Sequence, residues 1–416
     1  MASRTRIISQ SKAVYVSPTG ILVPADVDAL ANAESGYIPD QLHRIDTFSF
    51  DVDLAGARTD VREFGQLARI GVVTMSEVAP SFSIGYYLGN GENEARLGFN
   101  IEGIDSTDPN TGSSQFISGM QTEDPKKKEK NIYCITVKEG QDAFDSNTFS
   151  TTRGFHDVVA FGNCFFNSYT ANFSVGEIPR VDVEGTADNL VFYTGASSGL
   201  ANPALDLQGA RADTGVFRLD LPSTGDMDVL VLRPDDVNVS FSVGDFDIGG
   251  TNFTDVHAQS ATIEVPLARD DIEALGAERA VARPIAFPID VTMSISALLK
   301  NFNDGALDLI LTGTADAQET NIAVKIDNSD QQPTHHFMLQ NCVLDSQNFA
   351  LGLDDNETVD LTFSAQIGGA NQSENGLFYS GNFYTGTAQN DYSTRADFLV
   401  MDDLDDPSHL FYHNRG

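Results

Sequence analysis

Tryptophan is absent from this 416-residue sequence, and cysteine and basic residues are scarce. The three cysteines, Cys134, Cys164 and Cys342, are odd in number and lack a Cys-x-x-Cys spacing. We therefore expect buried free thiols rather than a disulfide framework or a zinc site. Only 25 Lys and Arg stand against 60 Asp and Glu, which gives a net charge of −35. Because phosphate and anionic lipid surfaces are held by clustered Lys and Arg, this balance disfavours nucleic-acid binding and membrane binding.

Long apolar runs are also missing, so the sequence predicts no membrane-spanning helix. The N-terminus has no apolar stretch of the signal-peptide type, and we expect no signal peptide. Hydrophobic residues make up 41% and charged residues 20% of the chain, which is typical of a folded protein. At roughly 150 residues per domain, this length predicts two or three domains.

The dominant pattern is that of β-strands. Phe48, Phe50 and Val52 alternate with polar residues, which is the period of a half-buried strand. Strand-like segments continue at 78–88 and recur through most of the chain, and the Gly- and Asn-rich residues 89–94 predict a hairpin turn. Strong helix signals are few. The clearest lies at 268–280, with acidic residues in its first turn.

In this acidic chain, basic residues cluster in two segments. Residues 1–40 are expected to form an N-terminal arm, and residues 105–130 an exposed insert that is polar and interrupted by Gly and Pro. Both are candidates for contacts with acidic surface on another copy of the chain. The candidate residues are Arg4, Arg6, Lys12, Lys126, Lys127, Lys128 and Lys130.

An internal repeat is the most informative feature. Four short blocks recur in the same order, and they begin at Asp60 and Asp271, Asn131 and Asn321, Asn163 and Asn341, and Val191 and Leu377. We interpret this order as two tandem copies of one β-rich domain, at 41–200 and 227–400, each with a short helix. Residues 201–226 would be a connector, with a short helix starting at Asn202 and Pro203, and 401–416 a C-terminal tail.

No motif supports catalysis, a cofactor or a metal site. The string Gly195-Ala-Ser-Ser-Gly199 matches a nucleophile elbow but lacks the helix that the elbow needs after Ser197. The seven histidines are scattered without metal-ligand spacing, and the acidic residues at 402–406 lack the loop pattern of a calcium site. We therefore predict that the protein is not an enzyme and has no cofactor.

Several stretches together resemble the tail tube, or major tail, proteins of tailed bacteriophages. These stretches are LHRIDTFSFDVDLAGARTDVREFGQLARIG, SFSIGYYLGNGENEARLGF, NCFFNSYTANFSVGEIPRVDVEG, IEVPLARDDIEALGAERAVARPIAFPIDVTMSISAL and NCVLDSQNFALGL. The resemblance implies two β-sandwich or β-barrel domains of the tail-tube type, each with a flanking helix. It implies self-assembly into rings that stack, in which three duplicated chains close a pseudo-sixfold ring. It also implies that the protein is assembled in the host cytoplasm and belongs to the virion.

The same resemblance implies that DNA passes through an acidic tube without specific binding. The implied partners are other copies of the chain and other tail proteins, such as the tape measure, the terminator and a sheath. Three alternatives stay open at this point: a viral decoration or sheath-type protein, a carbohydrate-binding β-sandwich module of the tail, and a hydrolase that would rest on Ser197 alone.

Overall fold

Strands make up nearly all of the regular structure, which confirms the mainly β fold expected from the sequence. The computed structural model describes residues 7–19, 39–53, 58–74, 79–89, 91–103, 115–121, 129–138, 157–193, 200–210, 216–217, 219, 237–242, 257–277, 279–298, 320–327, 333–350, 358–369 and 375–381.

The strands fall into two groups along the chain. The first group is β1 (Ile7–Pro18), β2 (Asp40–Leu42), β3 (Ile45–Asp51), β4 (Arg58–Val61), β5 (Gly71–Thr74), β6 (Ser81–Tyr87), β7 (Glu102–Gly103), β8 (Lys130–Lys138), β9 (Asp157–Ser174) and β10 (Arg180–Tyr193). The short strands β11 (Leu200–Ala201) and β12 (Val216–Phe217) follow. The second group is β13 (Val237–Ser242), β14 (His257–Pro266), β15 (Ile289–Leu298), β16 (Thr320–Asp327), β17 (Pro333–Ala350), β18 (Thr358–Ile367) and β19 (Gly376–Gly381).

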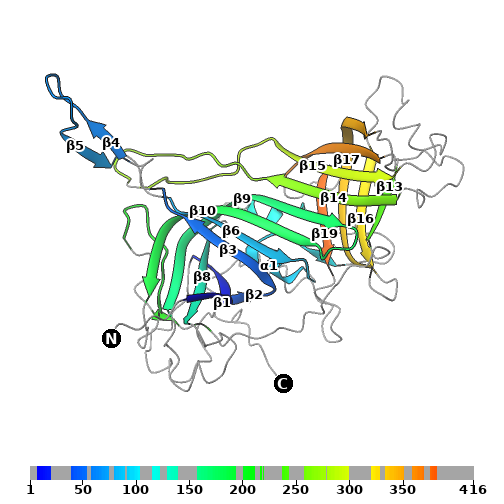
Figure 1. The fold of residues 1–416 in the computed structure, drawn as a ribbon, viewed down its shortest axis with the longest axis horizontal. Helices are drawn as coiled ribbons and strands as arrows, with labels where there is room; N and C mark the ends of the chain where they lie inside the picture. Colours follow the sequence, from blue (N-terminus) through cyan, green and yellow to red (C-terminus); the bar gives the residue numbers. More distant parts are fainter. Residues whose placement is uncertain are drawn as a thin grey trace, which may run out of the picture.

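One 15-stranded sheet connects both groups in the order β13-β16-β17-β18-β15-β14-β9-β10-β6-β3 (Figure 1). The strand pairs in it are antiparallel, apart from the short parallel pair of β19 and β7. The two groups meet where β14 pairs with β9, and again at the short β19–β7 pair. The sheet is therefore continuous from the second half of the chain into the first.

Both halves follow the same strand order. In the first half the neighbours are β1-β8-β9-β10-β6-β3, and in the second half they are β13-β16-β17-β18-β15-β14. Each strand of the second series takes the place of the corresponding strand of the first.

Alternation of apolar and polar residues sets which face of the sheet is buried. In β15 the residues Ile289, Val291, Met293 and Ile295 are buried, while the residues between them are exposed or half-buried. The first half of β9 instead reads as a continuous apolar run. It is buried on both faces, because Phe161 packs in the main core while Ala160 packs in a second core formed with β1 and β8.

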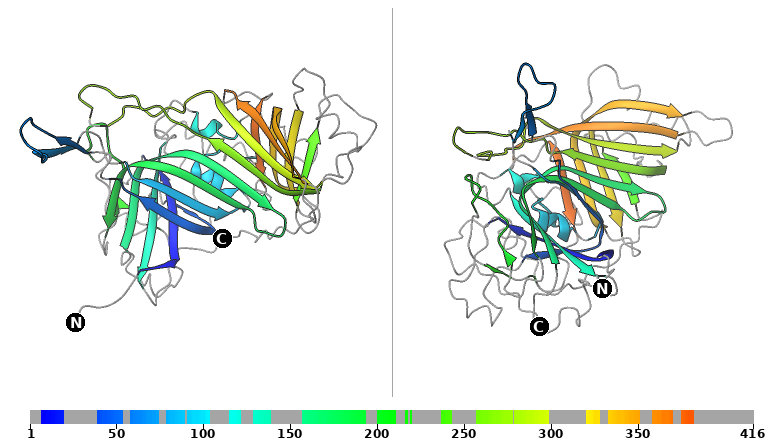
Figure 2. Two further views of the ribbon diagram at one scale, coloured as in Figure 1. Left: turned by 45° about the horizontal axis from the view of Figure 1, so that its top comes forward. Right: turned by 60° about the vertical axis from the view of Figure 1, so that its left-hand side comes forward.

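Helical structure is sparse among the described residues and lies inside the first half. The α-helix α1 (Glu92–Leu97) lies within the curve of the first-half strands (Figure 2). Residues 89–94, expected to be a hairpin turn, thus lead into a helix. The short 3₁₀ helix η2 (Ser118–Met120) follows Phe116, whose ring stacks on Phe99 at 4.6 Å between centroids.

Three expectations from the sequence were wrong. The described residues of 268–280 form no helix; they lead into and out of a turn, with bridges that pair Arg269 with Ile285 and Ile272 with Ala282. The insert at 105–130 is not wholly exposed, because residues 115–121 and Lys130 contribute to the interior. Residues 1–40 are not simply an arm, because β1 is a buried strand of the sheet.

The connector also differs from its expectation. Asn202 starts no helix; its Oδ1 accepts a hydrogen bond from the Ala204 backbone N–H at 3.0 Å, in a buried turn. The C-terminal tail, at 401–416, lies outside the described residues.

Candidate assembly interface

A polar face covers the central strands from β18 to β3. The registers place Ser49, Ser83 and Glu184 side by side across β3, β6 and β10. They likewise align Thr170 of β9 with Glu264 of β14. The acidic residues on this face are Asp51, Asp182, Glu184, Glu264, Asp290 and Asp360. Apart from Arg180 on β10, the other described residues of this face are mainly Ser, Thr and Asn, so the surface carries negative charge.

The joint between the halves is an edge-to-edge strand pair. β14 and β9 pair from Ser260 with Ser174 to Pro266 with Ser168. The Thr262 hydroxyl donates a hydrogen bond to Asn172 Oδ1 at 3.2 Å across the joint. Cross-strand pairs of this kind stabilise a sheet. Behind the joint the two halves share one hydrophobic core, in which the ring centroids of Phe173 and Phe337 lie 5.7 Å apart.

An extended arm continues from this joint over the first half, and we call residues 268–286 the docked arm (Figure 1). The backbone N–H of Ile272 donates to the Ala282 carbonyl at 3.0 Å, and the arm turns at Gly276 with φ 90°. A left-handed φ at the turn suits glycine, which has no Cβ to clash.

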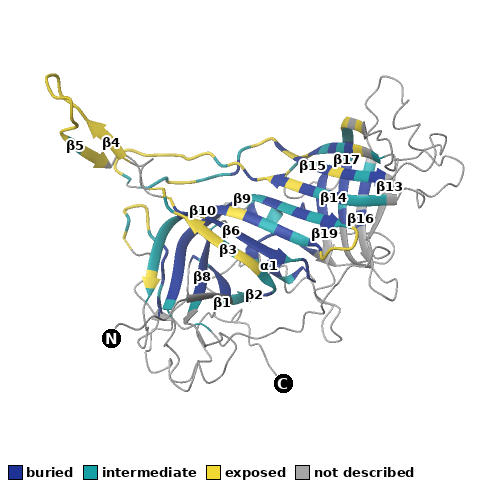
Figure 3. Cartoon of the chain, viewed as in Figure 1, coloured by how far each residue is buried: buried dark blue, intermediate teal, exposed yellow. Residues whose placement is uncertain are grey.

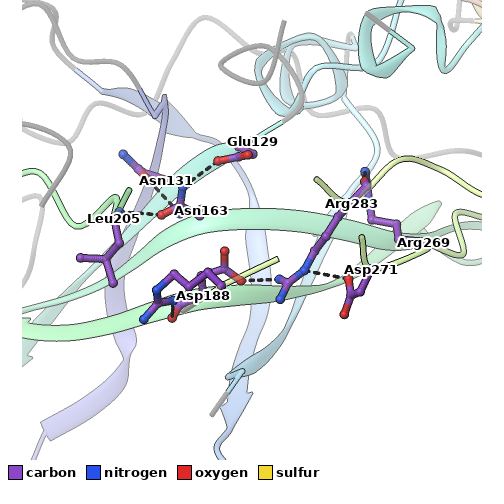
Figure 4. Close-up of polar contacts among 9 residues, drawn as sticks. Glu129, Asn131, Asn163, Asp188, Leu205, Arg269, Asp271 and Arg283 are labelled. Atoms are coloured by element: carbon purple, nitrogen blue, oxygen red, sulfur yellow. Dashed lines mark hydrogen bonds and ion pairs between the residues drawn. The ribbon is translucent and has the colours of Figure 1, made fainter. Parts of the chain in front are cut away.

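Arginines hold the base of the docked arm on β9 and β10 (Figure 4). Arg269 Nε donates to the Phe166 carbonyl at 3.0 Å, and the Arg269 and Arg283 guanidinium groups each lie 5.2 Å from the Phe165 ring centroid. Arg283 forms ion pairs with Asp188 and, at 2.9 Å, with Asp271. These contacts combine a cation–π interaction with charge-assisted bonds, and the planar guanidinium of Arg can make both at once with several donors.

Burial shifts the pKa of the groups at this contact. Burial raises the pKa of the Asp188 carboxyl, although the Arg283 and Arg279 guanidinium groups act in the opposite direction. Burial also raises the pKa of Glu129, which accepts a hydrogen bond from Asn163 at 2.6 Å, and lowers the pKa of Arg269 to about 10. The charges are therefore desolvated, and each depends on its partners.

The first half carries a corresponding hairpin, β4 and β5, which extends away from the body (Figure 3). We call residues 58–74 the projecting arm. Every described side chain from Arg58 to Ile70 is exposed, and Phe64 and Leu67 are as accessible as in an extended chain, at 105% and 108%. Large apolar side chains in this position form a candidate contact surface for another molecule.

Of the contact residues predicted from the sequence, the structure describes two, and neither lies at the docked arm or the projecting arm. Lys12 lies half-buried in β1, and Lys130 is buried in β8, where burial lowers its pKa to about 8. The prediction that Lys130 lies on an exposed insert was therefore wrong. Arg4, Arg6, Lys126, Lys127 and Lys128 lie outside the described residues.

The arginines of the docked arm were missed because their segment was assigned to a helix. One signal was available in the sequence. Asp60 and Asp271 open the same repeated block, and each of them pairs with an arginine of its own arm, Arg69 and Arg283.

Other features of the described residues bear on the remaining predictions. Cys134, Cys164 and Cys342 are buried thiols that form no disulfide, as expected. No cluster of His, Cys, Asp or Glu within the described ranges is arranged to hold a metal ion. No helix in that part of the chain is long and apolar enough to cross a membrane. Ser197 lies outside the described residues.

Comparison with known proteins gives a partial structural likeness. No family model matches the sequence, and no curated protein matches it. A chain in the cryo-EM structure of the anti-feeding prophage baseplate, which was sixfold symmetrised, is 12% identical, with a TM-score of 0.26. That match covers 35% of this chain and 93% of the other. A likeness at this level carries no argument about function.

Proposed function

We propose that this protein is a structural subunit of a phage-type tail, which assembles with copies of itself into closed rings that stack into a tube. The observation that carries the proposal is the β14–β9 joint. One half of the chain extends the sheet of the other by edge pairing, and β3, at the far end of the path, pairs only with β6 among the described strands. Repeated head-to-tail joining of this kind closes into a ring when the rotation from one copy to the next divides a full turn, and we propose that it does so here.

The polar face fits the lining of a tube for DNA. It carries six acidic residues and one arginine in the described part of the central strands. Because phosphates are repelled by such a surface, DNA would pass along it without being held. The buried apolar face, in contrast, packs against the interior of the chain.

Each chain would contribute two units to the ring. Three chains would then close a pseudo-sixfold ring, in line with the resemblance to tail tube proteins. The rings would belong to the virion and contact the tape measure, terminator and sheath proteins of the tail. The proposal requires no catalytic group and no cofactor.

Electron microscopy of the purified protein at high concentration tests this function. We expect rings with a central opening, and tubes when rings stack. Dispersed single chains, also in the presence of virion extract as a seed, would contradict the proposal. Threefold class averages with six similar lobes would support the number of chains.

A further inference from the structure

We propose that β3 of one chain pairs with the C-terminal part of β17 in the next chain, in the register that joins β14 to β9 within one chain. This inference rests on the proposed function and names the surface through which the copies join. The correspondence between the two halves of the chain carries it.

Matching irregularities fix the correspondence residue by residue. The β3–β6 ladder shifts register between Ile45 and Thr47, and the β14–β15 ladder shifts between Ala258 and Ser260. Residue 46 is skipped in the first ladder and residue 259 in the second. β3 therefore corresponds to β14 with a constant difference in residue number of 259 − 46 = 213.

A second pair of irregularities aligns β9 with β17. The β9–β10 ladder skips Asn167, between Phe166 and Ser168, and the β17–β18 ladder skips Asp345, between Leu344 and Ser346. The difference is 345 − 167 = 178. Asn163 and Asn341 differ by the same number, and both have left-handed φ, at 51° and 49°.

The two differences convert the internal joint into an intermolecular one. Within the chain, Thr262 lies opposite Asn172. Subtracting 213 from 262 gives Ser49, and adding 178 to 172 gives Ala350, so Ser49 of one chain would lie opposite Ala350 of the next. The same shift places Phe50 opposite Phe349. It places Asp51 opposite Asn348, so no like charges oppose each other there.

Both edges required for this pair lack a strand partner in the described structure. β3 pairs with β6 on one side only. Residues 343–350 of β17 pair with β18, whereas β16 pairs only with residues up to Cys342 on the other side. Six strands separate β17 from β3 in the sheet order, and the two lie far apart in Figures 1 and 2, so the partner is a second copy.

The projecting arm provides an independent reason for a second copy. Its ladder pairs Arg58 with Thr74, as the docked arm pairs Arg269 with Ile285, and both differences are 211. Arg269 bonds to the Phe166 carbonyl beside the internal joint. The corresponding contact for Arg58 is the Leu344 carbonyl of the next chain, so one strand pair and one arm would form each joint.

Disulfide trapping tests the register. A double variant carries Ser49→Cys and Ala350→Cys in the same chain and is mildly oxidised after assembly. We expect it to give a ladder of covalent oligomers that ends at the number of chains in the ring. Asn172→Cys with Thr262→Cys serves as the matched internal control, because the native side chains already meet at 3.2 Å. The native thiols are buried and should not contribute.

Two further arrangements separate the possible outcomes. A chain with Ser49→Cys alone should give no product, but a mixture with an Ala350→Cys chain should give dimers and nothing larger. Ser49→Cys with Phe349→Cys, one residue out of register, should give little product. If rings form but the in-register pair reacts no better than the out-of-register pair, the joint is wrong while the proposed function stands. If no rings form, both are overturned.

Discussion

The molecule has two similar hairpin-like arms, and only the docked arm packs on a surface of the same chain. The docked arm lies on β9 and β10, and its half-buried arginines contact a carbonyl, an aromatic ring and Asp188. The projecting arm has a similar ladder and a turn at Gly65 matching that at Gly276, yet its side chains are exposed. The two arms differ in whether a surface of the same chain lies within their reach. The docked arm contacts the first half beside it, whereas in the proposed joint the projecting arm would contact another copy.

The largest predicted effect separates the two arms directly. Arg283→Ala should lower the free energy of unfolding by about 3 kcal/mol, because it leaves the buried Asp188 carboxylate without its ion-pair partner. Part of the loss should be recovered at low pH, where Asp188 is protonated. Urea unfolding of the dilute, unassembled protein at two pH values measures both effects.

Arg58→Ala on the projecting arm, at the position that corresponds to Arg269, is the comparison variant. Arg58 is exposed, so the unfolding free energy should change by no more than about 0.5 kcal/mol. Ring assembly, followed by sedimentation, should weaken instead. Equal losses of folding stability in the two variants would remove the distinction between the arms.

The next effect concerns a carboxyl group in the interior of the first half. Glu94 in α1 accepts a hydrogen bond from the Tyr86 hydroxyl at 3.0 Å, and burial raises its pKa from 4.5 to about 7. The folded protein therefore binds more protons than the unfolded chain between these values, and its stability falls as the pH rises through them.

Glu94→Gln should remove this dependence. At pH 8 the variant should be about 3 kcal/mol more stable than the natural protein, because 2.5 pKa units correspond to roughly that energy, and near pH 4 the two should be equal. Unfolding curves across this pH range provide the measurement. The exposed Glu184→Gln is the control and should follow the natural protein at every pH. If the stability of Glu94→Gln varied with pH in the same way as that of the natural protein, Glu94 would not be the source of this pH dependence.

A smaller effect should be alike in both halves. The Asn163 N–H donates to Asn131 Oδ1 at 3.2 Å, and the Asn341 N–H donates to Asn321 Oδ1 at 2.9 Å. Asn163→Ala and Asn341→Ala should each lower the unfolding free energy by about 1–2 kcal/mol, since alanine disfavours left-handed φ.

The glycine variants at the same two positions sharpen this result. Asn163→Gly and Asn341→Gly keep the backbone conformation accessible and should lose less than the alanine variants. Thermal unfolding of the four proteins compares them. The side chains have different partners, Glu129 for Asn163 and Asn375 for Asn341, so the test is the gain of glycine over alanine at each position. A gain at only one position would weaken the correspondence on which the proposed joint depends.

These asparagines also show what the sequence could predict. Their blocks are recognisable as repeats in the sequence, because the same local chemistry is needed twice: a side-chain oxygen for the bulged backbone and a residue that tolerates positive φ. The alternating strands were predicted for a similar reason. Their apolar period of two reflects burial of one face, which is local information.

The arms and the insert could not be predicted in the same way. Ile272 and Leu275 have helical spacing, but a helix at 268–280 would need an apolar partner, and the structure leaves both residues exposed. Phe116 and Lys130 lie in a polar, lysine-rich stretch, yet both are buried by contacts with distant strands. Tertiary contacts decided each case, and they are not encoded in neighbouring residues.

The smallest effect on folding is expected at the arm tips, where the two arms are alike. Phe64 and Leu275 occupy corresponding positions beside the turn glycines, and they are 105% and 108% exposed. Phe64→Ser and Leu275→Ser should change the unfolding free energy by no more than about 0.5 kcal/mol, since no packing is lost.

The consequence of the tip substitutions should lie in stacking. Within one chain, docking of the arm base leaves Arg283 half-buried and the Leu275 tip exposed, so the tip is free for a contact with another copy. If both tips contact the adjacent ring, the double variant should still form rings but few tubes, which electron microscopy distinguishes. Leu207→Ser, at another exposed apolar residue outside the arms, is the control and should form tubes normally. Tubes of normal length from the double variant would show that the tips do not hold the rings together, and would leave stacking to surfaces other than the arms.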